Sequence, residues 1–482
     1  MGVTWGVSAW FHDAGLSVIK DGNIVFAGHA ERYSGKKHDK MLNKKIIDEA
    51  LSFGKPNQVA WYEKPWKKNL RKFWSGEWRY SPMDKHPKKY MESFGIHAPV
   101  TLYDHHYTHA TAGYYTSPFD NACIVVADAI GEFETITIWT AEGTDIKKVM
   151  TWRYPHSLGL LYSAFTQRCG LKPMDEEYIT MGMAGWGEPK YVKQIKNDFI
   201  DVTTLTLKKN VHKGIGDWMP GAKVEDIACS IQSVIEECIE QLMCTAMTYT
   251  RQKNVVFMGG VALNCVANPI LYEWFERAWI MPNPGDCGSS LGAALAHHGK
   301  HVEWTGPYLG TRIPFAYPVD AIISELEANK IVGVASGRAE FGPRALGHRS
   351  LLADPRGHEI KDQVNQIKRR QKFRPFAPAI LEEHAPSHFK MAHNHSPYMQ
   401  LVGTCLKPDL YPAIIHVDGT SRVQTVGKND SPGFRLLLER WYEKTGCPML
   451  LNTSLNIRGE PMVNTREDAD RFQSKYGIKV FS

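Results

Sequence analysis

Two histidines four residues apart, His105 and His109, stand in the run LYDHHYTHATAGYY. On a helix, residues i and i+4 share one face, so both imidazoles can reach a single ion. Two aspartates complete a candidate metal site: Asp128 ends the strand-like run VVAD, and Asp286 lies in the glycine-rich turn of NPGDCGSSLGAAL. Two nitrogen and two oxygen ligands suit Fe(II), Mn(II) or Zn(II) better than a thiolate zinc. The alternative for HxxxH alone is a pair of surface histidines beside unrelated acids.

The elements expected around these residues form two strand–turn–strand units. The first comprises WGVSAWF, HDAGLSVIK and, after a DG hairpin turn, NIVFAGHAERY. The second is NACIVVADAIGEFETITIWTAEG, and a buried strand in NVVFMGGVALN ends in a glycine turn. Helical periodicity is present in LNKKIIDEALSFG, closed by Gly54, and in IACSIQSVIEECIEQLMCTAMTYT. The pairing of units predicts a duplicated α/β domain of the actin/hexokinase kind.

Length and composition indicate two domains in a globular protein. A chain of 482 residues is too long for one ordinary core. Its 43% hydrophobic and 22% charged residues are typical of globular proteins. Frequent glycine and proline in 304–316 predict a linker between a domain over 1–303 and one over 317–482. The second domain is expected to open with a helix in PVDAIISELEANK and a strand in IVGVASG.

Charge, cysteines and the N-terminal residues bear on partners and location. The net charge of +6 permits a phosphate-bearing substrate without demanding nucleic acid. Scattered cysteines without a CxxC pair indicate reduced thiols. The run MGVTWGVSAWFHDAG shows no signal peptide, and no segment reaches membrane-spanning length. We therefore expect a cytoplasmic protein with no membrane partner.

Nine motifs carry a resemblance to a known family. They are SAWFHDAG, AERYSGKKHD, HHYTHA, SLGLLYSAFT, GGVALN, PGDCGSSLGAA, GRAEFGPRALGHRSLLADPR, KFRPFAPAIL and LLNTSLNIRGEP. In this order they resemble the O-carbamoyltransferases of nodulation-factor and antibiotic tailoring, over nearly the whole chain. The resemblance implies a compact member in which an N-terminal ASKHA-fold domain, like the universal protein of tRNA threonylcarbamoylation, is fused to a YrdC-like α/β C-terminal domain.

The family reaction implies the substrates and cofactors. Carbamoyl phosphate and ATP would give carbamoyl adenylate and pyrophosphate in the C-terminal domain. An acceptor hydroxyl would then take the carbamoyl group in the N-terminal domain, and AMP would leave. The resemblance implies ATP with Mg²⁺, and a divalent metal held by His105, His109, Asp128 and Asp286, with Fe(II) favoured over Mn(II) or Zn(II). This metal would act as a template and Lewis acid.

The candidate residues for carbamoyl phosphate and the adenylate lie in the C-terminal motifs. Guanidinium groups always carry charge and pair bidentately with phosphate oxygens. Carboxamide and hydroxyl groups suit a carbamoyl amide or an adenylate phosphate. The set comprises Arg338, Arg344, His348, Arg349, Arg374, Asn452, Ser454 and Asn456. The alternative for the arginines is a set of surface salt bridges.

The candidate catalytic and nucleotide-binding residues lie in the N-terminal motifs. His12 resembles the family's essential histidine, and would remove the acceptor proton or stabilise charge on the carbamoyl oxygen. A packed structural histidine is the alternative. Lys37 resembles the family lysine that contacts the carbamoyl or phosphate group. Gly259 and Gly260 would let the backbone approach a nucleotide, and Asn264 would contact its sugar or phosphate.

Three positions depart from the family pattern. DAIGE has Ala129 where the family has glycine, which bears on the turn after Asp128. EYITMGMAGWG has Ile179 and Gly185 where the family usually has lysine and proline. These two changes argue against a phosphate role for that loop.

The acceptor hydroxyl is suggested only by a basic and aromatic segment over 64–89. Cations interleaved with aromatics can follow a phosphate backbone and stack bases. The candidate contacts are Lys67, Lys68, Arg71, Trp74 and Trp78. They favour a hydroxymethyl pyrimidine, such as 5-hydroxymethylcytosine, in a nucleotide or in DNA, where a duplex base would have to be flipped out. The equal alternative is a solvated helix whose tryptophans pack inward.

Other functions remain open from the sequence. A small-molecule sugar or antibiotic hydroxyl fits the compact chain equally well. A tRNA threonylcarbamoyl-type enzyme would act on an amine, and the RALGHRS and RPFAP motifs argue against it. A non-catalytic nucleotide-binding regulator would not need His12, Lys37, the metal ligands and the arginines. The oligomeric state is left open.

Overall fold

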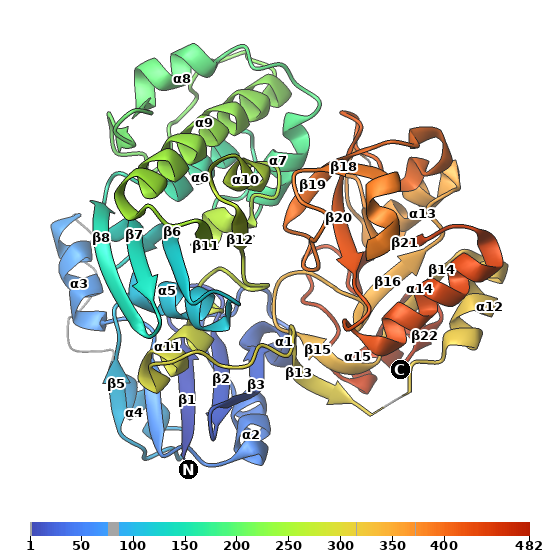
Figure 1. The fold of residues 1–482 in the computed structure, drawn as a ribbon, viewed down its shortest axis with the longest axis horizontal. Helices are drawn as coiled ribbons and strands as arrows, with labels where there is room; N and C mark the ends of the chain where they lie inside the picture. Colours follow the sequence, from blue (N-terminus) through green and yellow to red (C-terminus); the bar gives the residue numbers. More distant parts are fainter. Residues whose placement is uncertain (1, 76–85, 315, 372) are drawn as a thin grey trace.

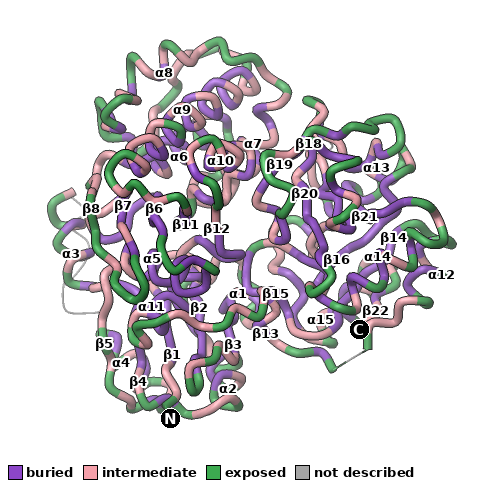
Figure 2. The backbone as a smooth tube through the Cα atoms, in the orientation of Figure 1, coloured by how far each residue is buried: buried purple, intermediate pink, exposed green. Residues whose placement is uncertain are grey.

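The structure is a computed structural model that describes residues 2–75, 86–314, 316–371 and 373–482. Figure 1 shows two lobes side by side: a larger one built from the N-terminal three-fifths of the chain, and a smaller one in orange and red. Both sheets of the larger lobe and the sheet of the smaller lobe have buried interiors in Figure 2. Among the residues described, no helix is both long and apolar enough to cross a membrane.

The first sheet confirms the predicted N-terminal hairpin. It contains β1 (Val3–Ser8), β2 (Gly15–Lys20), β3 (Asn23–His29), β4 (Gln58–Trp61) and β5 (Val100–Leu102), in the order β3-β2-β1-β4-β5. The first three strands are antiparallel neighbours, whereas β1, β4 and β5 run parallel. The predicted helix is α2 (Lys44–Phe53), which starts at Asn43, whose side chain accepts from the Ile46 N–H.

The second sheet repeats this arrangement. Its strands are β6 (Asn121–Gly131), β7 (Glu134–Glu142), β8 (Asp145–Arg153), β11 (Asn254–Met258) and β12 (Arg277–Trp279), in the order β12-β11-β6-β7-β8. Again three antiparallel strands are followed by two parallel ones. The same topology twice in one lobe confirms the predicted duplicated ASKHA-type domain, although the sequence shows no repeat.

Helices link and cover the two sheets. In the first half these are α1 (Ala30–Ser34), α3 (Pro65–Trp74), α4 (Pro87–Glu92) and α5 (His105–Thr116). The second half has α6 (Leu158–Arg168), α7 (Glu177–Ala184), α8 (Val192–Phe199), the predicted long helix α9 (Val224–Thr250), α10 (Leu271–Trp274) and α11 (Ser289–His298), with a small hairpin of β9 (Ile200–Asp201) and β10 (Thr206–Leu207). Helices α5 and α11 pack on each other between the sheets, so the turns that precede them meet at the centre of the lobe.

The smaller lobe is a mixed sheet of eight strands. These are β14 (Ile331–Ala335), β16 (Arg349–Ala353), β17 (Ala377–Leu381), β18 (Phe389–Met391), β19 (Leu401–Cys405), β20 (Thr420–Val426), β21 (Met449–Ser454) and β22 (Val480–Phe481), in the order β18-β19-β20-β17-β21-β16-β14-β22. The accompanying helices are α12 (Val319–Asn329), α13 (His358–Lys368), α14 (Pro432–Thr445) and α15 (Arg466–Tyr476). The predicted opening helix and strand are α12 and β14. The likeness of this lobe to YrdC stays a prediction.

The segment predicted as a linker contains a strand. β13 (Tyr308–Ile313) pairs antiparallel with β15 (Gly337–Glu340). Arg338 strengthens this pairing by donating to the carbonyls of Leu309 and Gly310, and it also donates to Val25 in β3 at 2.7 Å. Gly306, Pro307 and Pro314 flank a short run, YLGTRI, whose backbone pairs with β15 from the second lobe. The segment therefore fastens the two lobes together.

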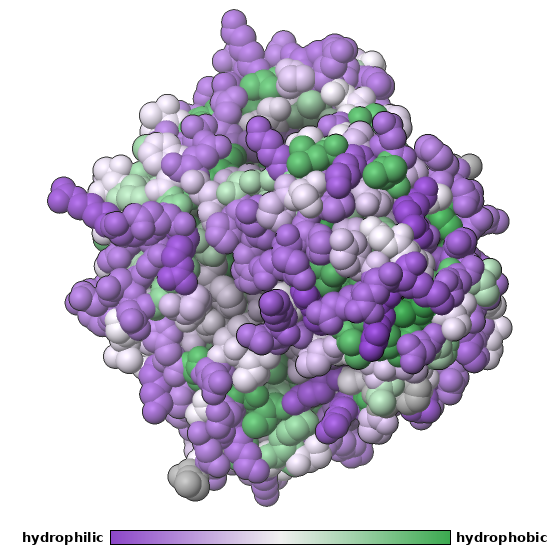
Figure 3. All heavy atoms as spheres, turned by 45° about the vertical axis from the view of Figure 1, so that its right-hand side comes forward, coloured by the Kyte–Doolittle hydropathy of each residue, from purple (hydrophilic) through white to green (hydrophobic). Residues whose placement is uncertain are grey.

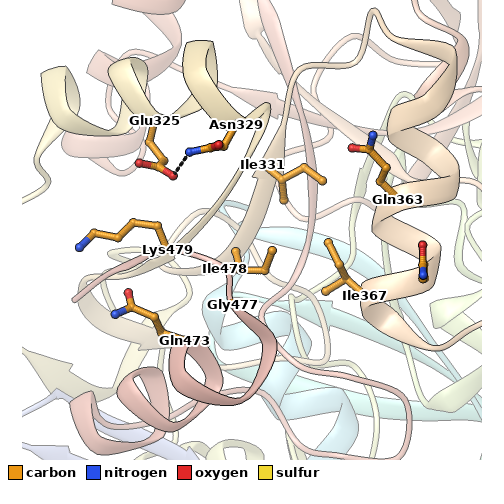
Figure 4. A pocket seen from close by; sticks show the side chains of 10 residues that line it. Glu325, Asn329, Ile331, Gln363, Ile367, Gln473, Gly477, Ile478 and Lys479 are labelled. Atoms are coloured by element: carbon orange, nitrogen blue, oxygen red, sulfur yellow. Dashed lines mark hydrogen bonds between the residues drawn. The ribbon is translucent and has the colours of Figure 1, made fainter.

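The surface shows one groove away from the predicted residues. The face in Figure 3 is mostly hydrophilic, with scattered hydrophobic spots. A groove of about 620 Å³ in the smaller lobe is lined by Ile331, Ile367 and Ile478 with polar neighbours, and Asn329 donates to Glu325 at its rim (Figure 4). None of the residues predicted to bind substrate or metal lines it.

Candidate active site

The four predicted metal ligands come together at the centre of the larger lobe. His105 and His109 lie on successive turns of α5, Asp128 lies near the end of β6, and Asp286 lies in the turn before α11. The two Nε2 atoms are 3.1 Å apart. His105 Nε2 is 3.4 Å from Asp128 Oδ2 and from Asp286 Oδ1, and His109 Nε2 is 3.4 Å from the same Asp286 oxygen. Four side chains from three separate elements thus direct one ligand atom each at a common point.

The charges of this group suit a divalent cation. Burial lowers the pKa of His105, but Asp286 and Asp128 outweigh it and raise the pKa to about 10. Burial raises the pKa of Asp286, but the two histidines outweigh it and hold that pKa well below its ordinary value. Two carboxylates, Asp128 buried and Asp286 half-buried, therefore favour positive charge between them. A divalent ion held by the four side chains would supply that charge and Lewis acidity. Within the described chain, Nδ1 of both histidines has no hydrogen-bond partner.

The predicted nucleotide turn touches this group. The backbone N–H of Gly260 donates to Asp128 Oδ1 at 3.2 Å. Gly259 has φ +91°, and a Cβ there would lie 2.1 Å from the carbonyl oxygen of Ala127, so the close approach of β6 and β11 requires glycine. The Asn264 amide exchanges two hydrogen bonds with the Gln232 amide on α9, at 3.1 and 3.2 Å. The turn is thus both a packing element and a wall of the metal group.

His12 and Lys37, predicted separately, belong to one hydrogen-bonded network. Asp13 lies 2.7 Å from His12 Nδ1 through one oxygen and 2.7 Å from His38 Nδ1 through the other. His38 Nε2 lies 2.6 Å from Asp175 Oδ1, which also accepts from Lys37 Nζ at 3.1 Å. Burial lowers the pKa of His38, but hydrogen bonds to the two aspartates outweigh it and raise the pKa to about 9.

Sequence reasoning missed Asp13, His38 and Asp175. The first two stand directly beside the predicted residues, in FHDAG and GKKHD, so adjacency was an available signal. Asp175 lies in the loop before α7, more than a hundred residues away, and only the fold brings it to His38.

Tyr178 connects this network to the smaller lobe. Its ring on α7 has Lys37 Nζ 5.7 Å from its centroid, and the Arg374 guanidinium carbon 4.7 Å from its centroid. A salt bridge of 2.7 Å between Arg458 and Glu176 joins the lobes beside it. Lys37 of the predicted catalytic pair and Arg374 of the predicted arginines therefore meet across one aromatic ring.

Five cations gather on the smaller lobe beside this ring, and we call them the cation cluster: Arg344, Lys368, Arg370, Arg374 and Arg422. Lys368 is buried and the arginines are half-buried. No carboxylate forms an ion pair with any of them in the part of the chain that the structure describes. Burial, then Arg422 and Arg374, lowers the pKa of Arg344 to about 9. Repulsion between uncompensated cations favours a bound anion.

Some members of the cation cluster were predicted and others were not. Arg344 and Arg374 were candidates from the sequence, whereas Lys368, Arg370 and Arg422 were not. Lys368 reaches two further candidates, because its Nζ donates to Ser454 Oγ at 3.0 Å and to Asn456 Oδ1 at 2.7 Å. The dense basic run KRRQKFR was the available signal for Lys368 and Arg370. Arg422 lies on β20 outside every motif, with its Nε buried and without a partner in the described chain.

Three C-terminal candidates lie outside the cation cluster. Arg349 is 0% exposed and donates to the carbonyls of Ser336, Thr311 and Asn464, among others. Arg338 donates only to carbonyls, as described above. His348 contacts the Arg338 carbonyl at 2.7 Å and stacks on the Tyr308 ring, with centroids 3.8 Å apart. Backbone carbonyls take up the donors of both arginines, and His348 Nε2 contacts Ser431 Oγ at 2.7 Å, which gives these side chains the contacts of structural residues.

One side-chain atom of Asn452 has no hydrogen-bond partner among the described residues. Its Nδ2 donates to the Ala345 carbonyl at 3.1 Å and to Gln424 Oε1 at 2.7 Å. Its Oδ1 is buried without a hydrogen-bond partner in the described chain. Since Ala345 follows Arg344, this acceptor lies in the wall of the cation cluster.

The candidate acceptor segment is less basic than its sequence suggests. Lys67 pairs with Asp104, and lies 3.9 Å from Glu132. Lys68 is buried and pairs with Glu63 at 2.8 Å. Arg71 is buried, with its guanidinium carbon 5.6 Å from the Tyr154 ring centroid.

Of the two candidate tryptophans in this segment, the structure describes one. Trp74 is 84% exposed, so it does not pack inward as the alternative reading of a solvated helix expects. Trp78 lies outside the described residues. In the described part of the segment, Lys67 and Lys68 are paired with acids and Trp74 is exposed.

Comparisons with known proteins agree with the sequence motifs. Residues 91–295 match the family model "Carbamoyltransferase N-terminus", and residues 323–482 match "Carbamoyltransferase C-terminus". An uncharacterized protein of Synechocystis is 33% identical, covering 97% of this chain and 93% of its own length. Nodulation protein NolNO of Sinorhizobium fredii is 29% identical, over 96% and 76% respectively. Nodulation protein NolO of Bradyrhizobium diazoefficiens is 31% identical, over 76% and 75%. The chain is a transferase and belongs to the carbamoyltransferase family.

Proposed function

We propose that this protein is an ATP-dependent O-carbamoyltransferase that works in two steps. At the cation cluster, water converts carbamoyl phosphate to carbamate and inorganic phosphate, and a carbamate oxygen then attacks the α-phosphorus of ATP to give carbamoyl adenylate and pyrophosphate. The carbamoyl group then passes to an acceptor hydroxyl beside His12 and the metal group, and AMP leaves. The observation that carries the proposal is a set of five cations that have no acidic partner among the described residues, joined through Tyr178 to the network of Lys37 and His12.

The charges of the first step suit the cation cluster. Carbamoyl phosphate and ATP with Mg²⁺ bring several negative charges together, and they repel one another without a positive wall. Planar guanidinium groups match phosphate oxygens in pairs and stay charged. Asn452 Oδ1, buried and unpartnered, can accept from the carbamoyl NH₂, which distinguishes a carbamoyl group from a second phosphate.

The charges of the second step suit the larger lobe. A divalent ion at His105, His109, Asp128 and Asp286, with Fe(II) as the favoured ion, would grip phosphate oxygens there. Gly260 links this group to the nucleotide turn through Asp128. Lys37 lies between the His12 network and the Tyr178 ring, where an adenylate arriving from the other lobe would pass.

For the acceptor we propose a hydroxymethyl pyrimidine carried on a nucleotide. The exposed tryptophans of α3, Trp66 at 58% and Trp74 at 84%, can stack on a base. The lysines beside them are paired with acids, which leaves little charge for following a DNA backbone. A hydroxyl on a sugar or antibiotic is the competing acceptor.

The direct test is incubation with carbamoyl phosphate, ATP, Mg²⁺ and Fe(II) under exclusion of oxygen. We expect pyrophosphate release and carbamoyl adenylate detected by mass spectrometry. A wild-type preparation with bound metal that forms neither product contradicts the proposal. 5-Hydroxymethyl-dCMP, hydroxymethylated duplex DNA and a set of free sugars are then compared for the gain of one carbamoyl group. Carbamoylation of the sugars alone rejects the nucleotide acceptor.

A further inference from the structure

The acceptors around His12 fix the protonation state of its ring. Nδ1 lies 2.7 Å from Asp13 Oδ2, and Nε2 lies 2.8 Å from the carbonyl oxygen of Met174. An ionised carboxylate and a backbone carbonyl can only accept hydrogen bonds, so both ring nitrogens carry a proton. His12 is therefore an imidazolium cation in this structure, and a ring in that state cannot act as a base.

His38 meets the same condition. Both of its ring nitrogens face carboxylate oxygens, those of Asp13 and Asp175. Asp13 thus accepts from two imidazolium rings whose centroids are 4.6 Å apart. A carboxylate bound on both oxygens has one orientation, and it fixes the direction in which His12 Nε2 points.

The backbone is strained where these groups meet. Asp13, His38 and Met174 have φ angles of +47°, +54° and +61°, in the left-handed region that non-glycine residues seldom adopt. Three such residues in one hydrogen-bonded network require the surrounding fold to hold them, and strain of this kind concentrates at functional sites.

We propose that Asp13 and His38 are positioning residues that keep His12 a charged donor to the carbamoyl carbonyl oxygen during transfer, and not a base toward the acceptor hydroxyl. The inference rests on the proposed function. The Met174 carbonyl oxygen stands opposite Nε2, where the carbamoyl oxygen takes its place when the adenylate is bound. A fixed cationic donor at that point stabilises the charge that develops on the oxygen.

The transfer step balances without a proton from His12. The acceptor hydroxyl oxygen attacks the carbamoyl carbon, and the C=O electron pair moves onto the oxygen that faces Nε2–H. The pair returns, the bond between the carbamoyl carbon and the phosphate oxygen breaks, and AMP leaves with the bonding electrons. The hydroxyl proton goes to solvent. His12 keeps both protons throughout.

The charged groups around His12 give the pH dependence its sign. Burial lowers the pKa of His12, Asp13 raises it by more, His38 lowers it and Asp286 raises it, with a net rise. His38 is held in turn by Asp175, which also accepts from Lys37 and Lys172. Loss of the Asp13 charge therefore lowers the pKa of His12, and loss of the His38 charge raises it.

The test compares Asp13→Asn and His38→Asn with wild type in the full-length, metal-loaded protein. Asparagine tolerates the left-handed backbone of both positions. Asp21→Asn is the matched control, because Asp21 is an exposed aspartate with φ +51°. Pyrophosphate release reports adenylate formation, and AMP release with water as the probe acceptor reports transfer, both from pH 5.5 to 10.

We expect wild-type AMP release to fall as pH rises through the pKa of His12. Asp13→Asn slows AMP release about tenfold to a hundredfold and moves the fall at least about one pH unit lower. His38→Asn moves the fall higher. Both variants keep the pyrophosphate burst of wild type, and Asp13→Asn accumulates carbamoyl adenylate at high pH. The control Asp21→Asn behaves like wild type in both measurements at every pH.

Other outcomes overturn the inference. AMP release that rises with pH, with the rise moved lower by Asp13→Asn, makes His12 a base. If the pH at which AMP release falls moves in the same direction in both variants, or in neither, then Asp13 and His38 are not positioning residues. Loss of the pyrophosphate burst in both variants places Asp13 and His38 in the fold or the first step. Absence of pyrophosphate and adenylate in wild type is a different result, because it rejects the proposed function itself.

Discussion

The two halves of the candidate site treat charge in opposite ways. In the larger lobe acidic and basic side chains of the site face each other: Asp128 and Asp286 face His105 and His109, and the His12 network alternates between histidine and aspartate. In the smaller lobe the cation cluster has no acid beside it within the described residues. A balanced group is stable as it stands, whereas an unbalanced one gains free energy only when an anion arrives. The difference points to an anion-collecting half and a half already arranged for transfer.

The largest effect that can break this comparison is expected from Arg344→Met. Loss of this guanidinium should slow pyrophosphate release about a thousandfold, equivalent to about 4 kcal/mol, because its bidentate pairing with phosphate oxygens is lost. Thermal unfolding should occur at the same temperature or higher, since the remaining arginines repel one another less.

Arg349→Met is the matched control for this variant. Arg349 is completely buried and bonded to backbone carbonyls, so its loss should destabilise the fold by about 3 kcal/mol or more. If Arg344→Met lowers stability as much as Arg349→Met does, the cation cluster is held by internal contacts and the contrast between the lobes is lost.

Asp286→Asn should give the next largest effect. This carboxylate faces both histidines, so its loss should abolish tight metal binding and slow AMP release about a hundredfold. Elemental analysis after dialysis checks the metal content independently of activity. The pyrophosphate burst should survive, because the cation cluster lies in the other lobe. Full metal retention in the variant would show that the four ligands were wrongly grouped.

The balanced half should also make stability depend on pH. The pKa of His38 is raised to about 9 in the folded protein, from an ordinary value of 6.5. The resulting stabilisation is therefore complete below about pH 6.5 and disappears as pH rises through 9. The raised pKa of His38 contributes about 3 kcal/mol or less to the free energy of unfolding. Urea unfolding at pH 6 and pH 9.5 should show this loss of unfolding free energy in wild type and a smaller loss in His38→Asn. An equal loss in both proteins would contradict the prediction.

Much of the fold could be predicted from the sequence because its signals are local. The hairpin at the DG turn, α2 with its Asn43 cap, and the long amphipathic helix α9 each depend on residues close together in the chain. The strand β13 was missed because its partner lies in the second lobe, and its own residues resemble a linker.

The candidate site divides in the same way. The four candidate metal ligands and His12 could be singled out as candidates because each stands in a recognisable run. Asp175 and Arg422 could not, because only tertiary structure brings them to the site. The sequence alone does not distinguish the arginines of GRAEFGPRALGHRS from one another. Residue type identifies a group that can bind phosphate, but whether backbone carbonyls already occupy its donors, as for Arg349, depends on the fold.

The smallest expected effect concerns the seam between the lobes, at a position where this chain departs from its family. A Cβ on Gly185, at the end of α7, would lie 2.2 Å from Cε1 of His416 in the smaller lobe. Gly185→Ala should therefore destabilise the protein by about 1–2 kcal/mol, because the buried His416 ring must shift. His416→Ala should remove most of that cost, which a double-mutant cycle in urea measures as a coupling energy. Additive effects would mean that the two lobes do not press together here. A full coupling would mean that Gly185 leaves the space that His416 fills, at the same seam that brings Tyr178 to Arg374.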